Sequence, residues 1–149
     1  MKVYMAGPLF TAAEQRWNRE IKKALEDFDY EVFLPQESTT NFSKKFDSQK
    51  IFEEDVKQLD DSDVIVAWIE GPDPDSGTCW EVGYAKARNK IVIAYTTDLR
   101  FQFADWGPHD LNLMLTYGVD FFLRDTPTVS PKHIVAEIKS FLIIKKVKG

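Results

Sequence analysis

The stretch DVIVAWIEGPDPDSGTCWEVGYAKARNKIVIAYT, residues 63–96, holds the clearest structural signal in the chain. Its two ends, residues 63–69 and 90–96, are nearly unbroken apolar runs, which is typical of parallel strands that are covered on both faces. Between them lies a loop rich in proline and glycine, followed by a helical pattern from Thr78 to Arg88. A strand, a helix and a strand in this order predict two parallel strands joined by a right-handed crossover.

The same alternation continues on both sides of this unit. Further strands are expected at residues 3–6, 30–35 and 118–123, and helices at residues 11–28, 49–59, 111–115 and 131–144. In the helix at 49–59, the apolar spacing predicts that Phe52, Val56 and Leu59 point inward. Residues 36–48 are polar and irregular, a long loop of the kind that often serves a site.

These elements predict one α/β domain over residues 1–149. We expect a five-stranded, mostly parallel sheet with helices on both faces, which is a three-layer sandwich of the flavodoxin-like or Rossmann-like type. In such sheets, ligands bind outside the carboxyl ends of the strands, near the point where the strand order reverses. Gly7, which ends the first strand, and the loop before Thr78 both belong to that edge.

The composition limits the classes of partner. The 149 residues carry a net charge of −5, which argues against a nucleic-acid polymer, because such binding depends on neutralising phosphates. No apolar run approaches the length of a membrane span, and the N-terminus enters a strand without a signal-peptide pattern, so we expect no membrane association and a cytoplasmic location. Cys79 is the sole cysteine and the two histidines lie far apart in sequence, so we expect no metal site.

Glu81 lies about one turn into the helix predicted from Thr78, among positions that otherwise look apolar. One interpretation is structural: Thr78-Cys79-Trp80-Glu81 fits the capping box, in which the glutamate accepts a hydrogen bond from a backbone amide at the helix start. The other interpretation is catalytic. At the binding edge of the sheet, an ionised carboxylate with a protonated carboxyl beside it can attack a glycosidic carbon and protonate the leaving group.

Two other carboxylates lie near the same predicted edge. Asp55 borders the apolar stripe of its helix, where a carboxylate is costly unless it is paired; the alternative is an edge position that reaches water. Asp75 lies in the loop before Glu81, where it could also be a turn-former. Because no dinucleotide loop, triphosphate loop or nucleophile-elbow motif occurs, carboxylates are the plausible chemical agents and no cofactor is expected.

Three blocks of the sequence occur in an order known from one enzyme family. They are VYMAGPLF at residues 3–10, EEDVKQLDDSDVIVAWIEGPDPDSGTCWEVGYAKARNKIVIAY at residues 53–95, and GPHDLNLMLTYGV at residues 107–119. The D-x-G-T-x-x-E-x-G-x-A pattern in the second block is fairly specific, and N-L-M-L downstream adds to it, whereas A-G-P alone is weak. Over residues 3–119 the chain resembles the nucleoside 2-deoxyribosyltransferase family.

This resemblance implies roles for four side chains. The family's nucleophilic glutamate falls on Glu81, and the aspartate that assists the leaving base falls on Asp55. The tyrosine of the first strand, near the nucleophile, falls on Tyr4. The aspartate that holds the sugar hydroxyls falls on Asp75, and with Glu81, Asp55 and Tyr4 it completes the predicted catalytic region.

The resemblance also implies contributions from a loop and from a second subunit. Gln36, with Glu37 as the alternative, occupies the loop that contacts the base in the family, and Gly7 lies at the substrate edge of the sheet. The family asparagine that reaches into a neighbouring subunit's site falls on Asn112, with Met114 beside it. The chain is therefore expected to form a homo-oligomer whose functional minimum is a dimer, and a tetramer or a hexamer is compatible with this expectation.

The expected reaction moves the 2-deoxyribosyl group from a 2'-deoxyribonucleoside to a free nucleobase, with retained configuration and a covalent ester on Glu81. An N-glycoside hydrolase of deoxynucleosides or of deoxynucleoside 5'-monophosphates is the alternative, and a non-catalytic nucleoside-binding module is a weaker one. Residues 7–11 are apolar and poor in donors, which favours a substrate without a phosphate. Many family members end in a tyrosine-bearing tail, whereas this chain ends KKVKG, which leaves the balance between transfer and hydrolysis open.

Overall fold

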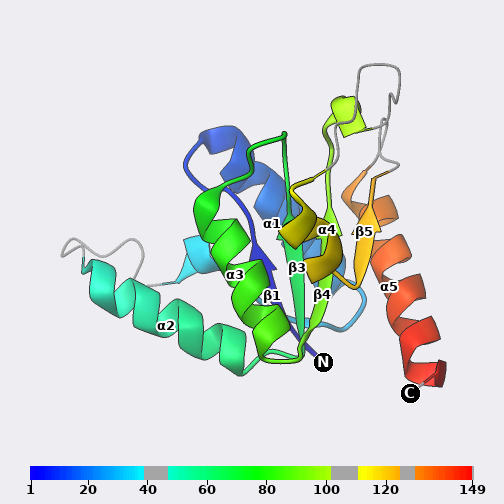
Figure 1. Cartoon of the computed structure of the whole chain (residues 1–149). Coiled ribbons are helices and arrows are strands. Elements are labelled where there is room, and N and C mark those ends of the chain that lie inside the picture. The colour runs from blue at the N-terminus through cyan, green and yellow to red at the C-terminus, as the bar shows by residue number, and fades with distance from the viewer. Residues whose placement is uncertain (39–46, 102–110, 125–129, 149) are drawn as a thin grey trace.

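The structure of the chain is a computed structural model, which describes residues 1–38, 47–101, 111–124 and 130–148 (Figure 1). The strands are β1 (Lys2–Ala6), β2 (Glu31–Phe33), β3 (Val64–Trp68), β4 (Ile91–Tyr95) and β5 (Phe121–Leu123). The α-helices are α1 (Ala12–Glu26), α2 (Ser48–Asp60), α3 (Ser76–Ala87), α4 (Leu113–Gly118) and α5 (Pro131–Lys148). Short 3-10 helices follow β2 and β4, at η1 (Pro35–Glu37) and η2 (Leu99–Phe101).

All paired strands run parallel, and the five-stranded sheet has the order β2-β1-β3-β4-β5. This is the order of the flavodoxin-like fold, so the predicted fold class is confirmed. From β1 the chain moves outward to β2 and then crosses back to β3, on the other side of β1. The carboxyl ends of β1 and β3 therefore flank the point where the strand order reverses, which is where such sheets bind ligands.

The strand side chains alternate between two buried cores. Val3 and Met5 of β1 face the core that includes residues of α1 and α5, whereas Tyr4 and Ala6 face the core that includes residues of α2, α3 and α4. The strands β3 and β4 alternate in the same way, so both of their faces are buried, and this explains their unbroken apolar sequences. Figure 1 shows α2 and α3 on one side of the strands and α5 on the other. Tyr4 is thereby directed towards α3.

One prediction about α2 is wrong. Leu59 is buried as expected and Val56 is partly covered, but the side chain of Phe52 is 55% exposed. In Figure 1 the first turns of α2 lie away from the sheet, and only its later turns approach it. Phe52 therefore has the inward spacing but no sheet to pack against. Residues 39–46 of the predicted loop, and residues 107–110 of the third family block, lie outside the described residues.

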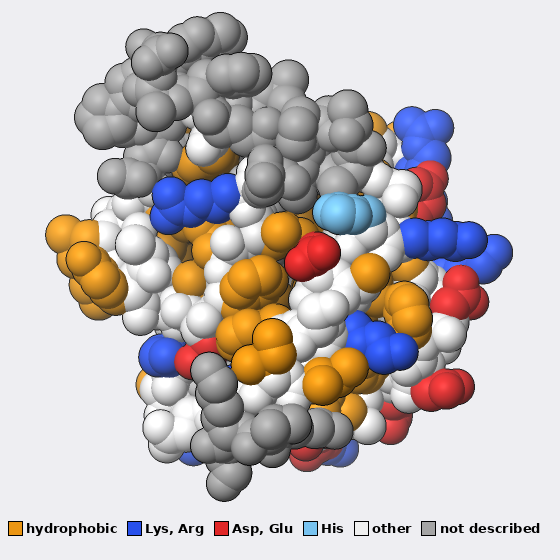
Figure 2. All heavy atoms as spheres, turned by 90° about the vertical axis from the view of Figure 1, so that its right-hand side faces the viewer, with side chains coloured by type: hydrophobic (Ala, Val, Ile, Leu, Met, Phe, Trp, Pro, Cys, Tyr) orange, Lys and Arg blue, Asp and Glu red, His pale blue; other side chains and the backbone are white. Residues whose placement is uncertain are grey.

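The surface of the described residues carries charges of both signs. Figure 2 views the molecule from the right-hand side of Figure 1, and on this face acidic and basic side chains are interspersed with hydrophobic ones. No helix in the described part of the chain combines the length and the apolar character that a membrane crossing requires.

Candidate active site

The start of α3 is capped by Asp75. Its Oδ2 atom accepts hydrogen bonds from the backbone N–H of Thr78 at 2.8 Å and from the Thr78 hydroxyl at 2.9 Å. The helix therefore begins at Ser76, two residues earlier than predicted, because aspartate is a strong N-cap residue and lies three residues before Thr78. The structure does not support the capping-box interpretation of Thr78 and Glu81, because Asp75 is the cap and Glu81 lies in the second turn of the helix.

The Glu81 carboxylate meets the hydroxyl of Tyr4 instead. The Tyr4 hydroxyl donates a hydrogen bond to Oε1 of Glu81 over 2.5 Å, which joins the middle of β1 to α3. Burial, followed by the charge of Glu81, raises the pKa of Tyr4 far above its ordinary value, so the phenol stays protonated and acts as a donor. This bond engages Oε1 of Glu81 and holds the side chain towards β1.

The environment of Glu81 opposes its ionisation. Burial raises the pKa of Glu81 to about 8, the hydrogen bond from Tyr4 lowers it, and the nearby charges of Asp55 and Asp75 raise it. A buried carboxyl group with a pKa near neutrality can change its charge during a reaction. Glu81 thus has the properties of a functional group rather than those of a structural cap.

A cavity of about 250 Å³ lies in front of Glu81, between α2 and α3. Asp55 of α2 lines it together with Glu81 and Tyr4, and the remaining lining residues are Phe52, Val56, Leu59, Gly77 and Trp80. Asp55 is only partly buried, but its Oδ1 atom is shielded from water and has no hydrogen-bond partner in the described part of the chain. Burial, and then the charge of Glu54, raises the pKa of Asp55 to about 6.

None of the five predicted substrate residues lines this cavity, and Asp75 caps α3 instead. Gln36 is buried, where its amide donates to the backbone oxygen of Gln15 at 2.8 Å and accepts from Asn18 at 2.9 Å, so both ends of the amide are engaged. Gly7 lies where β1 passes close to β3: a Cβ atom at this position would be 3.2 Å from the Cβ of Trp68. Asn18 also donates to the backbone oxygen of Pro8 at 2.9 Å, so it links Gln36 to the loop after β1.

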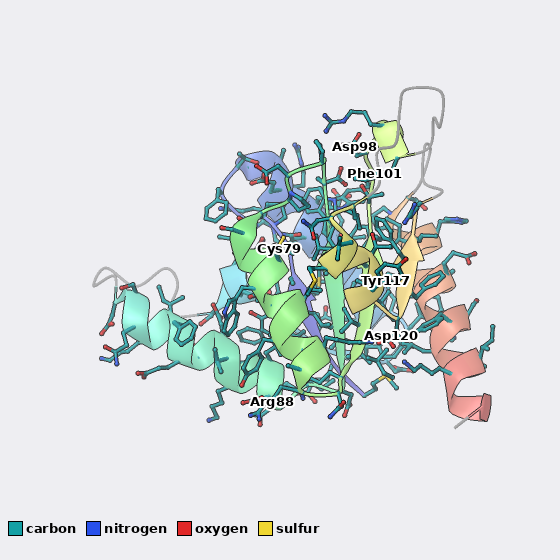
Figure 3. All side chains as sticks on the ribbon, viewed as in Figure 1. Cys79, Arg88, Asp98, Phe101, Tyr117 and Asp120 are labelled. Atoms are coloured by element: carbon teal, nitrogen blue, oxygen red, sulfur yellow. The ribbon has the colours of Figure 1, made fainter. Side chains whose placement is uncertain are left out.

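Asn112 and Met114 lie across α3 from the cavity. Asn112 caps α4, and its Oδ1 atom accepts from the backbone N–H of Met114 at 2.9 Å. Both residues line a separate hollow of about 360 Å³ that also includes Cys79. Figure 3 shows Cys79 near the first turns of α3 and Tyr117 on α4. Within one chain, the structure therefore does not bring Asn112 or Met114 to Glu81.

The apolar lining of the cavity is the part of the site that the sequence analysis did not include. Phe52 and Trp80 both line it, although neither belongs to a family motif position that carries chemistry. The sequence could have indicated Trp80, because it directly precedes Glu81 on a helix that begins at the binding edge of the sheet. Among the described residues, no three His, Cys, Asp or Glu side chains gather so as to hold a metal ion.

The arrangement suits cleavage of a bond to a sugar carbon. A buried carboxyl group held by a tyrosine and a second carboxyl group with a raised pKa line one small cavity, and these are the two groups that a retaining glycosyl transfer requires. A sequence model of the nucleoside 2-deoxyribosyltransferase family matches residues 3–115. The chain belongs to this family. The resemblance predicted from the sequence motifs is thereby confirmed.

Proteins that are similar to this chain support its family membership, but their names state different reactions. A conserved protein of Enterococcus faecalis superposes with a TM-score of 0.77 and 30% identity, over 94% of this chain and 98% of that one. A 2-deoxyribosyltransferase of Bacillus psychrosaccharolyticus superposes with a TM-score of 0.70 and 23% identity, over 84% and 87% of the two chains. A protein of Thermofilum pendens, whose name proposes a 2'-deoxynucleoside 5'-phosphate N-hydrolase, is 32% identical over 63% of this chain and 66% of its own length.

Family membership identifies an enzyme that acts on nucleosides. Because one relative is named as a transferase and the other as a hydrolase, membership does not decide whether a base or water accepts the sugar.

Proposed function

We propose that this enzyme transfers the 2-deoxyribosyl group between nucleobases through a covalent ester on Glu81. The observation that supports this proposal best is the pairing of Glu81 with Tyr4 in a cavity that also contains the carboxyl group of Asp55. A glutamate that served only as a cap would turn towards the amides at its helix start, and here Asp75 already does so.

In the proposed first step, a carboxylate oxygen of Glu81 bonds to the anomeric carbon while the bond from that carbon to the base nitrogen breaks. The electron pair of the broken bond leaves with the base, and the proton of Asp55 neutralises it. In the second step, a nitrogen of the entering base attacks the same carbon, the ester bond to Glu81 breaks, and Asp55 takes up the proton of the entering base. Two inversions give overall retention.

The start of α1 supports a substrate without a 5'-phosphate. The backbone amides of Phe10 and Thr11 both donate to Oε2 of Glu14, at 2.9 and 2.7 Å, and the Thr11 hydroxyl accepts from the Glu14 amide. A phosphate at a helix N-terminus needs such amides and a positive local field. Glu14 already occupies these donors with a negative charge, so the segment after β1 is poorly suited to a nucleotide.

Product analysis tests the proposed reaction. With thymidine as donor, we expect deoxyadenosine to form when adenine is present, and only slow release of deoxyribose when it is absent. We expect thymidine 5'-monophosphate to react at least about tenfold more slowly, since a loss of about 1.4 kcal/mol in binding already has this effect. Chromatography of the nucleosides and a reducing-sugar assay give both rates.

Three results of this experiment would contradict the proposal. Equal release of deoxyribose with and without adenine would identify a nucleoside hydrolase. Faster cleavage of thymidine 5'-monophosphate would identify a nucleotide hydrolase, as the name of the Thermofilum pendens relative suggests. Binding of thymidine with no product of either kind would identify a non-catalytic module.

The proposal includes a homo-oligomer in which Asn112 and Met114 serve the site of a second subunit. The exposed side of α4 supports it: Leu113, Met114 and Tyr117 are 64%, 74% and 82% exposed. They border a hollow lined by Gly83 and Ala87 of α3 among others. Large apolar side chains that cluster at the surface mark association sites, and in symmetric dimers one such patch faces its own copy.

Light scattering is expected to give at least twice the chain mass of 17.2 kDa for the unmodified enzyme. A Leu113→Asp/Tyr117→Asp double variant is expected to be monomeric and inactive, because charges would be buried at the contact. Ile144→Asp, which changes an exposed apolar residue of α5, serves as the control and should leave the mass unchanged. A monomeric unmodified enzyme with full activity would refute this part of the proposal.

A further inference from the structure

The mouth of the Glu81 cavity is formed by two aromatic rings on different helices. Phe52 of α2 and Trp80 of α3 both line the cavity, and their ring centroids are 5.6 Å apart with an angle of 60° between the planes. Their side chains are 55% and 46% exposed, whereas Tyr4 at the inner end of the cavity is completely buried. The cavity therefore has a polar inner end and an aromatic outer end.

The Trp80 ring is supported from behind. Tyr84, one turn further along α3, stacks on it with a centroid distance of 5.0 Å and an interplanar angle of 14°. Tyr84 is itself held by its hydroxyl, which donates to the carboxylate of Asp60 at 3.1 Å, and by the guanidinium of Arg88, which lies over its ring at 5.4 Å from the centroid. A ring held in this way loses little freedom when a ligand contacts it, which favours binding.

The lining next to this mouth is also apolar. Val56 and Leu59 of α2 line the wall, and Asp55 is the carboxyl group on the same helix. A nucleoside has two matching ends: a sugar that must reach Glu81, and a flat aromatic base that must lie near the acid that protonates it. An aromatic mouth binds a flat heterocycle by stacking and by excluding water.

We propose that Phe52 and Trp80 form the binding wall for the nucleobase and thereby place the glycosidic bond between Glu81 and Asp55. This inference rests on the proposed function for its substrate. It assigns base binding to two residues that take no part in the chemical steps. Since a stacking wall reads the face of a base rather than its hydrogen-bonding edge, the wall accepts both purines and pyrimidines.

The test separates binding from chemistry. In Trp80→Ala, KM for thymidine and KM for adenine are each expected to rise about tenfold, because the loss of one base–aromatic contact has an effect of this size. The value of kcat should change less than about threefold, because the ring takes no part in the chemical steps. Phe52→Ala is expected to act in the same direction, and Trp80→Phe to restore most of the affinity. Phe28→Ala removes an exposed ring that does not line the cavity, so it should change neither constant. Thermal melting by circular dichroism confirms that each variant is folded.

A second measurement keeps this inference distinct from the proposed reaction. Titration calorimetry with free adenine and free thymine reports binding to the wall whether or not the enzyme turns over. Weaker binding of both bases to Trp80→Ala than to Phe28→Ala supports the wall even if no transfer occurs. Unchanged base affinity in a folded Trp80→Ala/Phe52→Ala double variant overturns it, even if the unmodified enzyme is an active transferase.

Discussion

Replacing Glu81 by glutamine is expected to abolish base exchange, with a loss of at least about 10⁴-fold in kcat, as is typical when a covalent nucleophile is removed. Glutamine can still accept the hydrogen bond of Tyr4, so the fold and the cavity should persist. Exchange of thymidine with adenine measures the loss. Mass spectrometry of the unmodified enzyme with substrate should show the added deoxyribosyl group on the peptide that contains Glu81.

The same substitution is expected to stabilise the protein at alkaline pH. In the unfolded chain Glu81 ionises near the ordinary glutamate pKa of 4.5, whereas burial raises its folded-state pKa to about 8. Below about pH 4.5 the group is neutral in both states and has no effect, and as the pH rises towards about 8 the unfolded state is increasingly favoured. The cost reaches roughly 4 kcal/mol, so Glu81→Gln should melt about 8–16 °C higher at pH 8 and not at pH 4.5.

A matched control is Glu53→Gln, which makes the same change at an exposed position of α2. It should alter neither the exchange rate nor the melting temperature at either pH. An active Glu81→Gln enzyme would refute the nucleophilic role of Glu81. A melting temperature that does not depend on the residue at position 81 would refute the assignment of a raised pKa.

Replacing Asp55 by asparagine is expected to lower kcat for natural nucleosides by about 10²–10⁴-fold, the usual contribution of a general acid. The reason is that asparagine cannot give a proton to the departing base. A donor with a good leaving group, such as p-nitrophenyl 2-deoxyriboside, needs no such proton and should lose far less. Equal losses with both donors would assign Asp55 to binding or folding instead.

The pH dependence follows from the same pair of carboxyl groups. With pKa values of about 6 for Asp55 and about 8 for Glu81, kcat/KM should be bell-shaped with its maximum near pH 7. Below the lower limb both groups are protonated and no nucleophile is present, and above the upper limb both are ionised and no acid is present. Between the limbs the pair shares one proton, and the reactive form is the one that carries it on Asp55. In Asp55→Asn, loss of the neighbouring charge should lower the remaining pKa.

The sheet was the easiest part of the molecule to predict. Each strand is a short apolar run, and the run at residues 63–69 has no polar position after Asp63 that could face water, so its burial on both faces follows from the residues alone. The helix positions were less certain. The apolar spacing of α2 shows which side Phe52 occupies, but it cannot show that the first turns of the helix lie away from the sheet.

The motifs named three residues that the structure brings to one cavity, Glu81, Asp55 and Tyr4, but they did not show the surroundings of the site. Asp75 and Thr78 are both good caps, and a local pattern cannot decide between two such residues three apart; the structure uses Asp75. Gln36 was assigned to the base from its loop, but its burial against Asn18 depends on how α1 packs, which no short motif contains. The catalytic roles of Glu81, Asp55 and Tyr4 stay predictions, and so do the roles of the substrate-binding residues.

The bond between Tyr4 and Glu81 connects positions 77 residues apart in the chain. Tyr4 and Glu81 therefore meet only when β1 and α3 have packed against each other. A partly unfolded chain in which β1 and α3 are apart contains both side chains but not this hydrogen bond. If Glu81 acts as proposed, we expect activity during refolding to appear together with the tertiary contact between β1 and α3, not with the separate helices or strands.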